Sequence, residues 1–162
     1  MTTILTLDKL KEITAISDAL GNQVDLLLPF VEIAETIHLQ DVLGIALYEE
    51  IIDDVENGTL SGFNETLVEN YLYNLSAWYS YFEASPFLIY RAEAKGITKK
   101  YSENSQALDR GEFALFRQSI LDKAMYFRNT TINFLNKNLD NYPLYRCDNR
   151  GGQDFASGIY VG

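Results

Sequence analysis

Apolar residues recur at intervals of three and four along most of this chain, which is the period of an α-helix packed on one side. In the segment 25–38 they include Leu26, Phe30, Ile33 and Ile37, which share one face of the expected helix. The segments 40–56, 64–94 and 113–139 follow the same rhythm. The pattern therefore predicts an all-α fold, a helical bundle of about four main helices.

Residues that begin or interrupt helices refine this prediction. Thr6 precedes a short amphipathic stretch and is a candidate N-terminal cap for a brief first helix. Gly58 and Gly62 bracket the loop that follows the segment 40–56. Pro86 lies well inside the segment 64–94 and lacks the N–H that a helix interior uses, so we expect a kink or break there.

Aromatic side chains surround the expected third helix. One stripe is predicted to be core and comprises Leu67, Tyr71, Leu75, Trp78 and Phe82. Four tyrosines fall on other sides of the same helix, at Tyr73, Tyr79, Tyr81 and Tyr90. A helix that is apolar on more than one side is packed on more than one side, which in a small domain suggests subunit contacts.

The last 21 residues differ in kind from the rest, so the chain divides into a helical bundle domain, 1–141, and an extended C-terminal arm, 142–162. The arm holds four glycines, which disfavour a stable helix, yet it retains apolar anchors. We expect it to lie on a surface of its own domain or of a neighbour. Its candidate protein-interface residues are Tyr142, Pro143, Tyr145, Phe155, Ile159 and Tyr160.

The net charge of the chain argues against nucleic-acid binding. In 162 residues, 23 acidic side chains oppose 13 basic ones, and phosphate binding needs clustered Lys and Arg. The simplest explanation of the acidic surplus is solubility. The surplus would also favour docking onto a basic protein, or form the wall of a channel through which DNA passes without binding. The densest acidic cluster is best explained as a solvated helix face, and it is also the candidate for such a channel wall: Glu49, Glu50, Asp53, Asp54 and Glu56.

Residues for catalysis or for metal binding are scarce. His38 is the single histidine and Cys147 the single cysteine, too few for a zinc site or for an evident Ser-His-Asp or Cys-His arrangement. We interpret His38 as a C-terminal helix cap and Cys147 as incidental. No Gly-rich phosphate loop and no run of 18 apolar residues occurs. We therefore expect no catalytic, cofactor or metal site, no enzyme activity and no membrane span.

Several short motifs, in order, resemble one known family. The block Leu43-Gly44-Ile45-Ala46-Leu47-Tyr48 follows Pro29 and an apolar helix. Further along come the aromatic third segment with Pro86, then Lys95-Gly96-Ile97 and Ser102-Glu103-Asn104-Ser105, and last Phe134-Leu135-Asn136-Lys137-Asn138 leading to Tyr142-Pro143-Leu144-Tyr145. Together they resemble the head-tail connector (head-completion or adaptor) proteins of tailed phages, in the form found in Bacteroidetes and crAss-like phages. The resemblance covers most of residues 5–146.

The resemblance implies a structural virion protein of the neck, made in the cytoplasm of the host bacterium and built into the junction of capsid and tail. Its copies would form a homo-oligomeric ring, dodecameric by analogy, beneath the portal protein. That ring would extend the DNA channel, let DNA pass without specific binding, and dock the tail or further neck ring proteins. The arm from Tyr142 onward would embrace the portal or a neighbouring copy.

Two other hypotheses stay open from the residues alone. One is a small helical protein-binding adaptor or host-factor inhibitor, which would be a stable monomer with its tail folded back on the bundle. The other, ranked last, is an enzyme that uses carboxylates or His38.

Overall fold

The computed structural model describes residues 2–14, 25–94 and 110–148, which are helical apart from short connections and contain no strand. This confirms the all-α prediction. The helical elements, in chain order, are α1 (Leu7–Thr14), α3 (Leu28–Ala34), η2 (Glu35–Leu39), α4 (Gln40–Leu43), α5 (Ile45–Asn57), α6 (Gly62–Leu67), η3 (Val68–Leu72), α7 (Tyr73–Ala94), α8 (Arg110–Lys137) and α9 (Pro143–Asp148).

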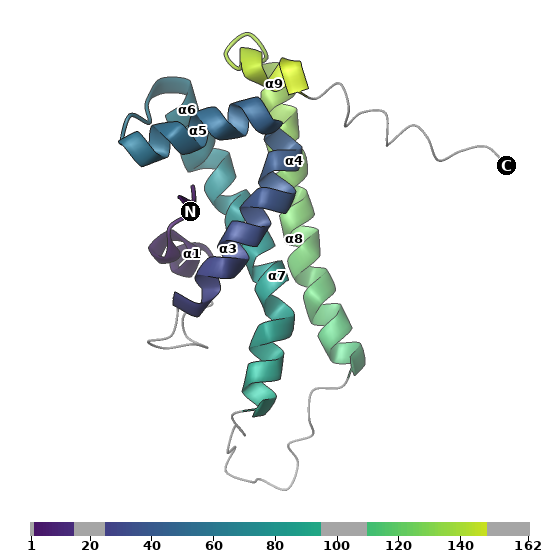
Figure 1. Ribbon diagram of the computed structural model, residues 1–162. Helices are drawn as coiled ribbons and strands as arrows, with labels where there is room; N and C mark the ends of the chain where they lie inside the picture. Colours follow the sequence, from purple (N-terminus) through teal and green to yellow (C-terminus); the bar gives the residue numbers. More distant parts are fainter. Residues whose placement is uncertain (1, 15–24, 95–109, 149–162) are drawn as a thin grey trace, which may run out of the picture.

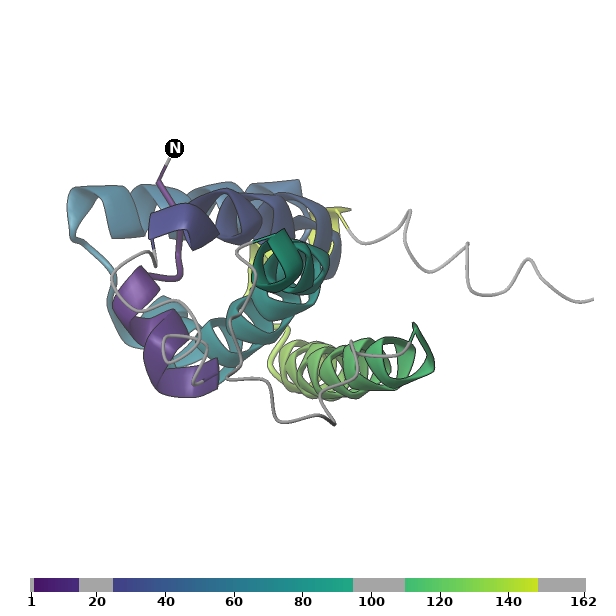
Figure 2. The same ribbon diagram turned by 90° about the horizontal axis from the view of Figure 1, so that it is seen from below.

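Two long helices each contain one π-helical turn. The first runs unbroken through α3, η2 and α4, and the second through α6, η3 and α7. Figure 1 shows α7 in the middle of the molecule, with α3 and α4 crossing on one side and α8 running beside it. Seen from below, α8 lies on the other side of α7 from α3 and α5 (Figure 2).

Helix α7 packs against α1, α3 and α8, so its burial on several sides arises within one chain. Tyr79 is only 3% exposed, and Leu75 and Ala77 are fully buried. Tyr73, Trp78 and Tyr81 are partly buried against the two apolar cores of the same chain. The prediction that α7 is packed on more than one side is confirmed, and the bundle itself supplies the partners that were ascribed to other subunits.

The helix predicted over 40–56 is in fact two helices, because Gly44 separates α4 from α5. Gly44 has φ 77° and ψ 158°, a region of backbone conformation open essentially only to glycine. The chain turns there, and α5 leads away across one end of the bundle (Figure 1). The sequence did not reveal this turn, because Leu43 and Leu47 continue the helical spacing across it and are both buried.

Of the kink or break predicted at Pro86, the break does not occur, since α7 continues past Pro86 to Ala94. Proline cannot donate a hydrogen bond to the carbonyl four residues earlier, which here belongs to Phe82. The hydroxyl of Ser85 donates to that carbonyl instead, at 2.8 Å. A local side-chain hydrogen bond thus replaces the missing backbone bond and helps the helix to continue.

The predicted C-terminal arm does not begin at Tyr142. Residues 143–148 form α9, which packs against α5. Tyr142 is 1% exposed and its hydroxyl donates to the carbonyl of Phe63 at 2.6 Å, while Tyr145 is 6% exposed. These two tyrosines complete the chain's own core and offer no interface. Pro143 is exposed and is the first residue of α9. Phe155, Ile159 and Tyr160 lie outside the described residues.

Candidate interaction surfaces

His38 lies within the π-helical turn η2 and not at a helix end, so its assignment as a C-terminal cap was wrong. Its Nε2 is 2.8 Å from Oε1 of Glu83, and its ring stacks on Tyr79 with centroids 3.9 Å apart. A second polar link follows one turn later, where Arg128 of α8 pairs with Asp41 of α4. These groups join the first long helix to α7 and α8, which is a structural role.

Glu35 is a buried carboxylate that sequence reasoning missed. Its two oxygens accept hydrogen bonds from the backbone N–H groups of Ile4 and Leu5, at 2.9 and 2.8 Å, and from the hydroxyl of Ser76 at 3.0 Å. Burial raises the pKa of Glu35, and these hydrogen bonds offset part of that effect. With all three donors supplied by its own chain, Glu35 anchors the N-terminal segment on α3 and α7.

The stripe predicted to be the inner face of the helix over 25–38 points largely outward. Leu26, Ile33 and Ile37 are 42%, 40% and 57% exposed. The inner face consists instead of Leu27, Val31, Ala34 and Glu35. Both stripes are spaced at helical intervals, so the sequence alone did not distinguish them. The exposed isoleucines continue to Ile45, at the start of α5, which is 58% exposed.

The acidic cluster of α5 divides into two groups. Glu50 and Asp54 accept hydrogen bonds from the side-chain amide of Asn64, at 2.8 and 3.0 Å, and Asp54 also accepts one from Thr59. These two acids therefore hold the loop between α5 and α6. Glu49, Asp53 and Glu56 are exposed, and with Ile45 they lie on one side of α5. We call these four residues the α5 face.

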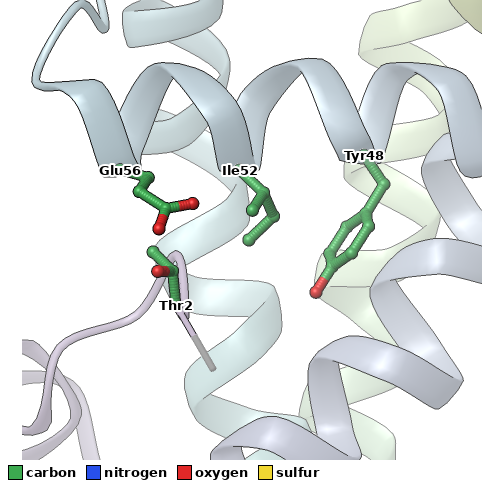
Figure 3. Close-up of a pocket in the computed structure, with 4 residues that line it drawn as sticks. All are labelled: Thr2, Tyr48, Ile52 and Glu56. Atoms are coloured by element: carbon green, nitrogen blue, oxygen red, sulfur yellow. The ribbon is translucent and has the colours of Figure 1, made fainter.

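A hollow of about 480 Å³ lies beside the α5 face (Figure 3). It is lined by Tyr48, Ile52 and Glu56, which project from α5 toward Thr2 of the N-terminal segment (Figure 3). Burial, with a smaller contribution from the nearby Glu35 carboxylate, raises the pKa of Tyr48 to about 12. The phenol therefore stays protonated and uncharged at neutral pH.

The outer side of α8 carries apolar residues that were not singled out from the sequence. Leu115 and Tyr126 are 74% and 65% exposed, and Phe116 is 42% exposed. Lys123 lies between them along the helix, and we call these four residues the α8 face. The sequence could have indicated that Leu115 and Tyr126 are exposed, because both fall outside the helical spacing of Phe113, Ile120, Ala124 and Phe127.

An open groove of about 500 Å³ runs along the α8 face. Its lining residues are Trp78 of α7 and, from α8, Ser119, Asp122, Lys123, Tyr126 and Phe127. The ammonium group of Lys123 lies 5.1 Å from the centre of the Trp78 ring and 3.0 Å from the hydroxyl of Ser119. Aromatic residues are enriched at protein-binding surfaces, and the rims of such surfaces are polar.

Charge is distributed unequally between these two faces. The α5 face has three carboxylates and no cation, whereas the α8 face has one cation, Lys123, and the carboxylate of Asp122 lines the same groove. Among the described residues, no three His, Cys, Asp or Glu side chains converge as metal ligands would, and no helix has the length and apolar character to cross a bilayer.

One family model matches residues 39–154, and its description is "Family of unknown function (DUF6712)". No curated protein and no solved structure matches the chain. The match begins at Leu39, at the end of η2, and spans α4 to α9.

Proposed function

The chain belongs to the DUF6712 family, and we propose that it is a structural virion protein, a head-tail connector that forms a ring beneath the portal. In this role it extends the DNA channel and docks the tail or a further neck protein. The motifs between Leu43 and Tyr145 support this proposal, because they resemble those of the head-tail connector proteins of tailed phages. The structural observation that supports the proposal is the presence of two exposed surfaces of different composition, the α5 face and the α8 face.

A closed ring needs two such surfaces on every copy. Each subunit of a ring contacts one neighbour with one patch and the other neighbour with a different patch. In this chain the two faces belong to different helices, and neither takes part in the cores that hold the bundle together. The bundle can therefore keep its fold while both faces are occupied.

The test is electron microscopy of the purified protein, alone and mixed with the portal ring from the same phage. We expect rings in the mixture, stacked coaxially on the portal, and we expect the protein in purified virions at the neck. Monomers in both samples, or absence of the protein from intact particles, would contradict the proposal.

A second candidate function is a small helical adaptor or host-factor inhibitor. One observation favours it: Tyr142 and Tyr145, at the start of the tail, are folded into the chain's own core. That is what a stable monomer with its tail on the bundle requires. Under this alternative, the α8 groove would hold a host protein, and the isolated protein would remain monomeric in the presence of the portal.

A further inference from the structure

We propose that the ring is held together by the α5 face of one copy seated on the α8 face of the next copy. In this contact Glu49 and Asp53 of the first copy face Lys123 of the second, and Ile45 packs near Tyr126. The inference rests on the proposed function, since it specifies which surfaces meet in the ring. It gives the exposed acids of α5 a role at the subunit boundary and not on the wall of the channel.

The acidic side of this contact is ready to receive cations. Glu49 and Asp53 are exposed on the same side of α5, one turn apart, and no basic group among the described residues forms an ion pair with either. Asp53 is fixed locally, because the side-chain amide of Asn57 donates to it at 3.0 Å. Ile45 adds an apolar contact at the start of the same helix face.

The basic side is equally open. Lys123 is held above the Trp78 ring and beside Ser119, and it forms no ion pair with any carboxylate that the structure describes. This restraint reduces the side-chain entropy that Lys123 would lose on binding an acidic partner. Tyr126, Phe127 and Trp78 supply the apolar walls of the groove in which that partner would sit.

The distribution of charge disfavours the pairing of two α5 faces. Such a pair would oppose the three carboxylates of one copy to the three of the other, whereas the α8 groove offers the cation Lys123, next to a single carboxylate, Asp122. Like charges placed opposite each other across an interface cost several kcal/mol, whereas opposite charges favour association and fix its register. The α5 face is therefore suited to the Lys123 side of the α8 groove and not to a second α5 face, and contact between two different faces is the condition for head-to-tail growth into a ring.

The two faces are also separated within one copy. Helix α5 packs on α9 at one end of the bundle, whereas α8 packs along α7. In the view from below, α7 lies between α5 and α8 (Figure 2). The two faces of one copy therefore do not meet. Each face is free to contact the other face of a second copy.

The experiment uses two charge reversals, Glu49→Lys and Lys123→Glu, in the full chain. Each variant alone places like charges at every contact of the ring, so we expect at least a roughly tenfold rise in the protein concentration at which rings form. Mass photometry and electron microscopy, with and without the portal ring, measure this concentration. The matched controls are Glu69→Lys and Lys137→Glu, which reverse exposed charges outside both faces and should leave ring formation unchanged.

Recombination of the two variants gives the decisive result. In an equimolar mixture, alternating copies place Glu49 against Lys123 at one contact and Lys against Glu at the next. We therefore expect the mixture to form rings again, as should the double variant that carries both reversals in one chain. Circular dichroism and thermal melting check that each variant is folded.

The outcomes separate the inference from the proposed function. If the wild-type protein forms rings but neither reversal affects them, the inference is wrong and the α5 acids are free to line the channel. If the reversals weaken the ring and neither the mixture nor the double variant restores it, the pairing of these two faces is also wrong. If the wild-type protein forms no ring even with the portal, it is the proposed function that fails.

Discussion

Glu35 illustrates what a single residue contributes and why the sequence did not reveal it. The sequence alone predicts that an acidic residue in an amphipathic helix is exposed to solvent. Here the carboxylate is 1% exposed and binds the backbone of a segment some 30 positions earlier in the chain. Only the tertiary fold brings those donors to Glu35, so helical periodicity gives no sign of them.

The raised pKa of Glu35 predicts how stability depends on pH. Burial lifts the pKa of the folded state above the ordinary value of 4.5, so between these two values the folded protein holds more protons than the unfolded chain. The free energy of unfolding therefore falls as the pH rises through this window. Glu35→Gln removes the titration, so its pH profile should lack this fall.

Urea denaturation of both proteins between about pH 4 and pH 8 measures the effect, and the wild-type minus variant difference isolates Glu35 from other titrating groups. Glu69→Gln, at an exposed position, is the matched control and should leave the profile parallel to the wild type. A difference that stays constant with pH for Glu35→Gln would contradict the prediction.

The predicted helices were mostly correct in position, and their errors have specific physical causes. The segments that repeat at three and four residues all proved helical, because that spacing reflects burial along one side of a helix. The turn at Gly44 escaped because apolar residues on each side of it point into the same core. The continuity at Pro86 escaped because it depends on one side-chain hydrogen bond from Ser85.

The turn between α4 and α5 depends on the backbone of Gly44. With φ 77° and ψ 158°, alanine at this position would be strained, so Gly44→Ala should destabilise the protein by about 1–3 kcal/mol. Gly58 caps α5 with φ 66° and ψ 29°, and an added Cβ there would meet nothing within 4 Å. Gly58→Ala should therefore cost less than Gly44→Ala, about 1 kcal/mol.

Chemical denaturation of both variants compares the two glycines directly. Equal costs would show that the turn at Gly44 relaxes to accept a side chain. A straightened α4–α5 helix in the Gly44→Ala variant, detected as a gain in helical circular dichroism, would explain such a result.

The continuity of α7 predicts a coupling between Ser85 and Pro86. Ser85→Ala leaves the Phe82 carbonyl without its donor and should cost about 1 kcal/mol. Pro86→Ala restores a backbone N–H that can reach the same carbonyl. In that background the cost of Ser85→Ala should fall toward zero, which a double-mutant cycle of unfolding free energies measures. Costs that simply add would contradict the assigned role of Ser85.

The assembly of helices around α7 was the least predictable property of the chain. Its aromatic residues suggested contacts with other subunits, yet α1, α3 and α8 of the same chain surround it. Conversely, the surfaces left for partners are a stripe assigned to the core, at Ile33 and Ile37, and the outer side of α8. Periodicity identifies apolar faces, but which faces meet depends on the angles at which helices cross, and those were not evident from the sequence.

The boundary between the folded bundle and its tail gives a final prediction that separates the two candidate functions. Tyr142 and Tyr145 close the core, so truncation after Asn141 removes two buried aromatic side chains, each worth about 3–5 kcal/mol, and should prevent folding. Truncation after Asp148 keeps both tyrosines and should leave the melting temperature unchanged.

In a connector whose remaining tail contacts the portal, the protein of residues 1–148 should fold normally but bind the portal ring more weakly. An adaptor whose tail packs on its own bundle should instead lose thermal stability with that same truncation, while its oligomeric state stays monomeric. Tyr142→Phe, which removes only the hydroxyl that binds Phe63, is the mild control for both measurements and should cost about 1 kcal/mol.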